Sequence, residues 1–165
     1  MKKVNEFEIV PSLMKQIQEG AFLTVTAKGQ TNVMTIGWGL VGILWGKSVM
    51  MVAVRNSRHT FSLMEDADSF TVSVPTTGMH KELDFCGTRS GRTIDKFEEC
   101  KLVARKAQRV GSPVLDVPGY HYECRGLYKS ALDPQMLAKE LETLYPKKDY
   151  HTLYFGEIVA CYQTE

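Results

Sequence analysis

Short apolar segments along the chain predict a protein built mainly of β-strands. The expected strands cover residues 21–27, 32–38, 47–54, 69–75, 101–107, 120–131 and 152–162. The third of them contains the uninterrupted apolar stretch Val49–Val54, which is typical of a strand buried on both faces. Segment 69–75 instead alternates and is rich in residues that favour strands.

Three short helices are expected between these strands, at residues 11–17, 58–66 and 134–144. We expect Ser57 to cap the second helix and Asp133 the third, because both side chains accept hydrogen bonds from the first N–H groups of a helix. Residues 78–99 mix glycines, charges and short helical pieces.

Many strands and few helices favour an antiparallel β-barrel with peripheral helices. A doubly wound parallel sheet would need longer helices between its strands, and only the helix after Ser57 is placed to serve. There is no internal repeat or linker, so we expect residues 1–165 to form one domain of a mainly β, barrel-like fold.

Composition and charge exclude several classes of protein. The 165 residues (18.6 kDa) are 44% hydrophobic and 24% charged, which is enough for a core, and the formal net charge is +1. This balance gives no basic footprint for a nucleic acid or a membrane surface, and neither partner is expected. The start of the chain has no signal-like apolar segment, so we expect a cytoplasmic protein.

Common catalytic and metal motifs are missing from the sequence. The four cysteines, of which Cys86 and Cys100 are the nearest pair, have no zinc or dithiol spacing, so free thiols are expected. The histidines show no metal-ligand spacing, and no metal site is expected. A Gly-x-Ser-x-Gly elbow and a dinucleotide fingerprint are also missing, so a nicotinamide cofactor would bind without a Rossmann fold.

Segment 32–38 is the first candidate site. Gly37 would let a planar ligand approach the backbone, and Trp38 would supply an apolar wall. An ordinary strand with a glycine bulge and a buried tryptophan is the simpler interpretation, and the segment alone favours it.

Two further segments suit an anion. In 55–60, N–H groups at a helix start stand beside two arginines, which favours phosphate, although a capped helix with a solvated turn explains the pattern equally well. In 85–93, two glycines alternate with hydroxyls and arginines, as in an anion-binding loop or a mobile basic loop. Arg89 and Arg92 could lower the pKa of the Cys86 thiol, but a packed cysteine is the simpler interpretation.

Taken together and in this order, the segments resemble the flavin reductase-like family, the FMN-binding split barrels that include flavoredoxin. The resemblance covers nearly the whole chain. It rests on the ordered spacing of segments 20–25, 32–38, 55–60, 69–75, 86–92, 95–97 and 151–159.

The resemblance implies a six-stranded Greek-key split barrel that forms a homodimer, with one FMN near each subunit interface. Members pass electrons from NADH or NADPH to flavin, or between proteins. The implied FMN-binding residues are Asn32, Met34, Thr35, Gly37 and Trp38 in the first segment, Arg55, Asn56, Ser57 and Thr60 in the second, and Cys86, Gly87, Ser90, Gly91 and Lys96 in the third. Within this set Arg55, Ser57 and Thr60 would hold the phosphate. His151 would face the nicotinamide, and no catalytic residue is implied because the flavin ring itself accepts the hydride.

The chain departs from the better-known reductases in one respect. Where those usually carry a proline pair, it has Leu44-Trp45-Gly46-Lys47-Ser48, and Trp45 would either cover part of the flavin site or pack at an interface. Three functions therefore stay open: an NAD(P)H-dependent flavin reductase, a flavoredoxin-type electron carrier, and a barrel that holds another ligand, such as haem, or none. The cluster around Arg55 and Ser57 is an argument against the third, and Arg89 and Arg92 could meet an acidic protein partner.

Overall fold

The computed structural model describes all residues from 1 to 165, and its main element is one antiparallel sheet. Its strands are β1 (Lys2–Lys3), β2 (Ala21–Ala27), β3 (Gln30–Ile36), β4 (Gly39–Leu44), β5 (Lys47–Arg55), β6 (Ser69–Pro75), β9 (Gly119–Ala131) and β10 (His151–Thr164). They are ordered β3-β2-β6-β9-β10-β5-β4, with β1 paired to β10. The strands β7 (Ala104–Arg105) and β8 (Val114–Leu115) form a separate small sheet.

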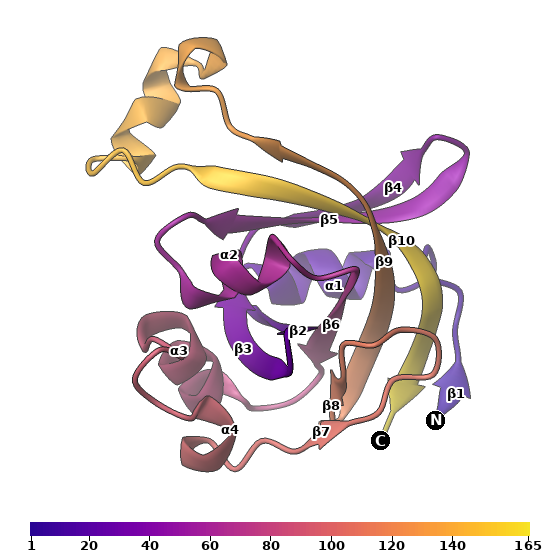
Figure 1. The fold of residues 1–165 in the computed structure, drawn as a ribbon. Helices are drawn as coiled ribbons and strands as arrows, with labels where there is room; N and C mark the ends of the chain where they lie inside the picture. Colours follow the sequence, from indigo (N-terminus) through magenta and orange to yellow (C-terminus); the bar gives the residue numbers. More distant parts are fainter.

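The helices are short, and those at the lower left of Figure 1 lie outside the sheet. The helices are α1 (Val10–Ile17), α2 (His59–Met64), α3 (His80–Thr88) and α4 (Lys96–Glu99), with the 3-10 helices η1 (Pro134–Met136) and η2 (Lys139–Leu144). The two 3-10 helices belong to a segment that projects from the barrel between β9 and β10, in orange at the upper left of Figure 1. No helix has the length and apolar character needed to cross a membrane.

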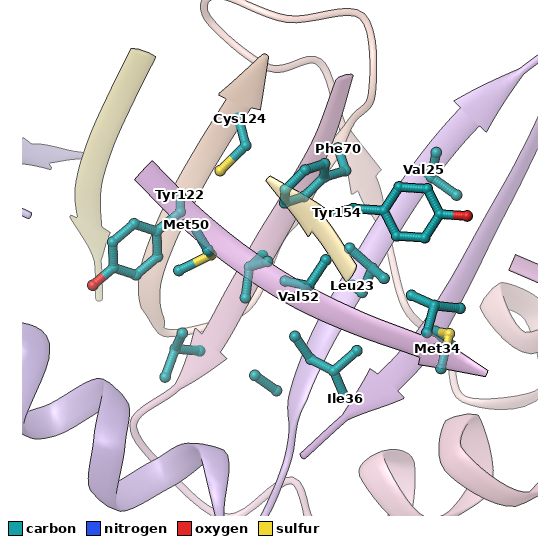
Figure 2. Close-up of a cluster of buried hydrophobic side chains, with 14 of the residues drawn as sticks. Leu23, Val25, Met34, Ile36, Met50, Val52, Phe70, Tyr122, Cys124 and Tyr154 are labelled. Carbon is teal, nitrogen blue, oxygen red and sulfur yellow. The ribbon is translucent and has the colours of Figure 1, made fainter. Parts of the chain in front are cut away.

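The sheet curls around one main core. Figure 2 shows side chains from β2, β3, β5, β6, β9 and β10 pointing into the same space. They include Leu23, Met34, Val52, Phe70 and Tyr122, all buried. Because strands distant in the sequence meet here, the core fixes the relative position of the two halves of the sheet.

A second, smaller core explains why β2 is apolar on both faces. Leu23 and Val25 point into the main core, whereas Phe22 packs on the outer side with Leu83 and Cys86 of α3. The α3–α4 layer therefore covers the outer face of β2 and β3. This placement brings the loop between the two helices next to β3.

The expectation of a mainly β fold is confirmed, with differences in detail. The sheet has eight strands rather than six, because β1 and β4 were not expected. The prediction of a strand over 101–107 is wrong. Only β7 forms in this segment, and it is short because its one pairing partner, β8, has two residues. The helix expected at 134–144 is two 3-10 helices, because Leu137 and Ala138 between them are extended; Asp133 does cap the first.

Two buried polar side chains near the start of β9 fix its position. His121 contacts the Ser73 hydroxyl through Nδ1 (3.0 Å) and the Thr164 hydroxyl through Nε2 (2.8 Å). Glu123 accepts hydrogen bonds from the backbone N–H groups of Gln108 (2.8 Å) and Arg109 (2.6 Å). Burial lowers the pKa of His121 to about 4, so the ring is neutral at neutral pH.

We expect this histidine to make the fold sensitive to acid. Between pH 6.5, the ordinary histidine pKa, and about 4, the unfolded chain binds a proton that the folded chain does not, so the free energy of unfolding falls as pH falls. The loss approaches about 3 kcal/mol at the lower limit. His121→Gln should flatten this part of a urea-unfolding pH series, whereas His80→Gln, at an exposed position, should not. An unchanged slope in His121→Gln would contradict the assignment.

Candidate functional site

A cavity of about 310 Å³ opens where β3 ends beside the last residues of β5, a size at the lower end of ligand-binding pockets. Its walls come from β3 and the two residues after it, from β5, from the start of α2, from α3 and from β10. The lining residues are Met34, Thr35, Ile36, Gly37, Trp38, Ala53, Arg55, Arg58, Gly87 and His151. We call this the large cavity.

Aromatic rings form one side of the large cavity. The Trp38 ring lies 4.4 Å from the His151 ring, centroid to centroid, and 41% of Trp38 is exposed. The Tyr145 hydroxyl contacts Nδ1 of His151 at 2.9 Å. Burial, with Arg55 nearby, lowers the pKa of His151 to about 4, so this wall carries no histidine charge at neutral pH. The rings of Trp38 and His151 thus offer a planar ligand a surface to stack on. The rest of the lining is mixed, with apolar residues beside the guanidinium groups of Arg55 and Arg58.

A smaller and more polar cavity of about 100 Å³ adjoins the large one, and we call it the small cavity. The two share Met34 and Arg58. The other residues that line the small cavity are Asn32, Ser57, His59, Thr60, Thr88, Arg89, Ser90, Gly91 and Lys96. Three of the shared and lining side chains, Arg58, Arg89 and Lys96, are cationic and none is a carboxylate.

Lys96 is the most deeply buried of these cations, with 3% exposed. Its ammonium group donates to the carbonyl oxygens of Val33 (3.0 Å) and Cys86 (2.8 Å), which leaves one of three N–H donors for a ligand. Burial lowers the pKa of Lys96 to about 8. The ammonium is therefore charged at neutral pH in a poorly solvated place, where an anion would stabilise it.

His59 also lines the small cavity. Its Nδ1 is buried and has no hydrogen-bond partner. Burial lowers the pKa of His59, and Arg92 and Lys96 lower it further. Because a buried polar atom without a partner is uncommon, this nitrogen marks a place where a ligand atom fits. The cationic side chains of the small cavity, with the third N–H group of Lys96, supply the charge and the open donor that a phosphate group needs.

The wall between β3 and the α3–α4 loop is closely packed. Asn32 donates from Nδ2 to the Thr60 hydroxyl at 2.8 Å, and both side chains are buried. A Cβ atom on Gly91 would lie 2.2 Å from Oδ1 of Asn32. Only glycine therefore lets the loop approach β3 this closely.

The structure brings most of the predicted residues to these two cavities. Met34, Thr35, Gly37, Trp38, Gly87 and His151 line the large cavity, and Asn32, Ser57, Thr60, Ser90, Gly91 and Lys96 line the small one. Segment 32–38 is therefore more than an ordinary strand with a glycine bulge and a buried tryptophan, because its residues line both cavities. Arg55 lines the large cavity rather than the small one, and Asn56 and Cys86 line neither.

Arg55 lies away from the small cavity. Its guanidinium donates to the carbonyl oxygens of Asp149 (2.9 Å) and Leu144 (3.1 Å) and stands 5.0 Å from the centroid of the Tyr145 ring. Arg55 thus fixes the segment before β10 over the large cavity. The arginine of segment 55–60 that lines the small cavity is Arg58. Asn56 lines neither cavity: its Oδ1 accepts from the Thr152 hydroxyl at 2.9 Å.

Ser57 and Cys86 also differ from the sequence-based expectation. The Ser57 hydroxyl donates to the Asp149 carboxylate at 2.6 Å instead of capping α2. The Cys86 side chain is buried in the second core, and this burial raises the pKa of its thiol to about 12. Cys86 is thus a packed cysteine, and only its backbone carbonyl, which accepts from Lys96, reaches the site.

The structure adds Arg58, His59 and Tyr145 to the candidate residues. Arg58 and His59 belong to the segment 55–60 that predicted an anion site, so the signal was present, and both line the small cavity. Arg58 donates to the carbonyl oxygen of Gly87, which turns it toward the cavities. Tyr145 lies in the projecting segment, and no motif marked it.

Comparison with known proteins agrees with this geometry. The flavin reductase like domain matches residues 14–165, and the chain therefore belongs to the flavin reductase-like family. An uncharacterized protein of Archaeoglobus fulgidus is 31% identical over 138 residues, which cover 84% of this chain and 68% of the relative.

Two solved structures show the same fold. Flavoredoxin from Methanosarcina acetivorans is 25% identical with a TM-score of 0.69, over 88% of this chain and 68% of that one. An FMN-binding protein from Thermus thermophilus is 22% identical with a TM-score of 0.69, over 87% and 69%. The expected split-barrel fold is thereby confirmed.

We predict that Gly91→Ala destabilises the protein. The added methyl group must displace the Asn32 carboxamide and strain its hydrogen bond to Thr60, at a cost of about 1–3 kcal/mol, typical of overpacking. Thermal unfolding measures the effect. Gly42→Ala is the matched control, since nothing lies within 4 Å of a Cβ there. Equal melting temperatures for the two variants would contradict the prediction, because they would show that the α3–α4 loop moves away from Asn32 at no cost in stability.

Proposed function

We propose that the protein binds FMN, with the ring in the large cavity and the phosphate in the small one, and acts as an NAD(P)H-dependent flavin oxidoreductase. The observation that carries the proposal is a cavity with two aromatic rings in its wall beside a second cavity lined by three cationic side chains and by His59, whose buried Nδ1 has no hydrogen-bond partner. Membership of the flavin reductase-like family supports it.

Each part of the site has a task in this proposal. Arg58 and Lys96 neutralise the phosphate charge, and Asn32 and Thr60 fix the wall that faces it. Trp38 covers one edge of the ring. Bound flavin supplies the hydride and electron transfer itself, so no protein nucleophile or base is needed.

The first experiment is the visible spectrum of the purified protein after addition of FMN, followed by anaerobic reduction with NADH and with NADPH. We expect a bound-flavin spectrum and rapid bleaching by at least one nicotinamide. A protein that binds no FMN contradicts the proposal entirely.

The same experiment distinguishes the reductase from a second candidate function, that of a flavoredoxin-type electron carrier. The specific observation in its favour is the likeness to a flavoredoxin, together with Trp38, Tyr145 and His151 crowded at the ring end, which narrows access for a nicotinamide. A carrier would bind FMN, accept electrons from dithionite and a redox protein, and stay oxidised with both nicotinamides. The four free cysteines fit a reducing cytoplasm as its location in either case.

We further propose that the protein forms a homodimer through an apolar surface on the β4–β5 hairpin. This hairpin surface consists of Leu40, Leu44 and Trp45 with Tyr128 of β9, all exposed. Leu40 and Tyr128 lie on the same face of the sheet, since Leu40 pairs with Met51, Met51 with Phe155 and Phe155 with Tyr128. Trp45 packs against Tyr128 and Phe155, with centroids 5.9 and 6.4 Å away, and does not line the large cavity. An exposed aromatic and aliphatic cluster of this kind is typical of an interface.

Leu40→Asp tests the dimer, because Leu40 is 60% exposed and its replacement should not harm the fold. We expect light scattering to give twice 18.6 kDa for the parent protein and 18.6 kDa for the variant. Met136→Asp is the matched control, since Met136 is 83% exposed on the projecting segment. A monomeric parent protein would exclude the interface.

FMN affinity should depend on pH through Lys96. Its pKa is about 8 without ligand, and a phosphate dianion stabilises the charged form, so affinity should be highest below pH 8 and fall above it. Fluorescence titrations from pH 6.5 to 9.5 measure this profile. Riboflavin, which lacks the phosphate, is the control and should give a flat profile. Lys96→Met should remove the dependence; an unchanged profile would place the phosphate elsewhere.

A further inference from the structure

Tyr145 and His151 form a buried hydrogen-bonded pair in the wall of the large cavity. His151 is the first residue of β10, and Tyr145 follows η2 in the projecting segment. The Tyr145 hydroxyl lies 2.9 Å from Nδ1 of His151, and only 5% of Tyr145 and 7% of His151 are exposed. Which of these two atoms donates decides which nitrogen of the neutral imidazole carries the ring hydrogen.

The surroundings of the Tyr145 hydroxyl decide the direction of this hydrogen bond. The hydroxyl has no second partner, so if it accepted from Nδ1–H, its own hydrogen would be left without an acceptor in a buried place. Burial also raises the pKa of Tyr145, which keeps the phenol protonated at neutral pH. Tyr145 therefore donates to Nδ1, and the imidazole carries its hydrogen on Nε2.

Nε2 of His151 is the open end of the pair. It has no partner in the protein, it is not one of the polar atoms sealed from solvent, and His151 lines the large cavity. The Nε2–H group is therefore free to donate to a molecule in that cavity. Such a donor suits a carbonyl oxygen, because it supplies a hydrogen bond without placing a positive charge beside the ligand.

The groups around His151 keep its ring uncharged. Burial is the main cause of the low pKa of about 4, and the guanidinium of Arg55 on β5 adds to it by repelling the imidazolium. Asp149, in the projecting segment, acts in the opposite direction, but its carboxylate is occupied by the N–H group (3.1 Å) and hydroxyl (2.6 Å) of Ser57. At neutral pH the ring is thus a hydrogen-bond donor and not a cation.

We propose that Tyr145 is a positioning residue, which fixes the tautomer and the rotation of His151 so that Nε2–H is presented to a carbonyl oxygen in the large cavity. The Trp38 ring, 4.4 Å away, fixes the plane of the imidazole, and the Tyr145 hydrogen bond fixes its rotation within that plane. The carbonyl belongs to the flavin ring or to the carboxamide of a nicotinamide donor, which offer the same acceptor chemistry. The inference rests on the proposed function for this ligand, whereas the tautomer is a property of the ligand-free protein.

Nitrogen-15 NMR of the flavin-free protein tests the tautomer, because the shifts of Nδ1 and Nε2 report which of them carries hydrogen. We expect hydrogen on Nε2 of His151, with the resonances assigned by their loss in His151→Gln. Tyr145→Phe keeps the aromatic ring and removes only the hydroxyl. It should populate both tautomers and raise the pKa of His151 above 4, because the hydrogen bond to the neutral ring is lost.

Tyr150→Phe is the matched control for this measurement. Tyr150 lies in the same segment with its ring centroid 4.8 Å from that of Tyr145, and its hydroxyl makes no hydrogen bond to the protein. The control should change neither the tautomer nor the pKa of His151. Hydrogen on Nδ1 in the parent protein would overturn the proposal, and so would an unchanged tautomer and pKa in Tyr145→Phe.

Binding and kinetic constants identify the carbonyl. If it belongs to the flavin, Tyr145→Phe should weaken FMN binding by about three- to tenfold, the range of one neutral hydrogen bond. If it belongs to the carboxamide, FMN binding should stay unchanged, and the KM for NADH or NADPH should rise by the same factor with kcat altered less than about twofold.

A double variant separates positioning from a merely structural role. In a His151→Gln background, Tyr145→Phe should alter the affected constant by less than about twofold, because Tyr145 acts through His151. Equal losses in the two backgrounds would make Tyr145 a structural residue and overturn the proposal. Unchanged constants in Tyr145→Phe itself would leave Nε2–H without a ligand, with the same consequence.

Failure of the proposed function gives a different result. A parent protein that binds no FMN overturns that function and the role assigned to Nε2–H together. A parent protein that binds FMN normally, with Tyr145→Phe behaving like Tyr150→Phe in every measurement, overturns only the inference about Tyr145.

Discussion

One buried ammonium group links the sheet to the helical layer. Lys96, at the start of α4, donates to Val33 in β3 and to Cys86 in α3, so a single side chain joins three elements. The second core holds the same layers together, but apolar contacts alone do not fix a precise position. The two directional hydrogen bonds do, and they set the loop between α3 and α4 against Asn32. The small cavity depends on this placement.

The ring end of the site depends on a different cation. Arg55 holds the segment before β10 by donating to two of its carbonyl oxygens, while Ser57 binds the Asp149 carboxylate. Tyr145 is thereby brought against His151. The α3–α4 layer builds one end of the cleft and the projecting segment builds the other, and the two ends are connected. Ser57, which lines the small cavity, binds Asp149 of the projecting segment, and Arg58, which lines both cavities, donates to α3. Changes at one end should therefore affect the other.

How far the sequence predicted the structure depends on the range of the interactions. Strands such as 21–27 and 69–75 were predicted because alternation and apolar runs are local signals. β4 was missed because its glycines and outward-facing apolar residues, such as Ile43, resemble a loop. Within the site, segment 55–60 was recognised, but local sequence cannot show that Arg55 turns toward Leu144, 89 positions away. Tyr145 was missed for the same reason.

The net charge of +1 conceals a strong local imbalance. Arg58, Arg89 and Lys96 line the small cavity, and no carboxylate does. Arg92 donates to Ser57 beside it, and the Asp149 carboxylate accepts from the same serine. Burial lowers the pKa of Lys96 from 10.5 to about 8, so keeping it charged in the ligand-free protein costs about 3 kcal/mol. A bound dianion removes much of this cost. An anion bound in the small cavity would therefore stabilise the folded protein, because it would interact with the charged form of Lys96.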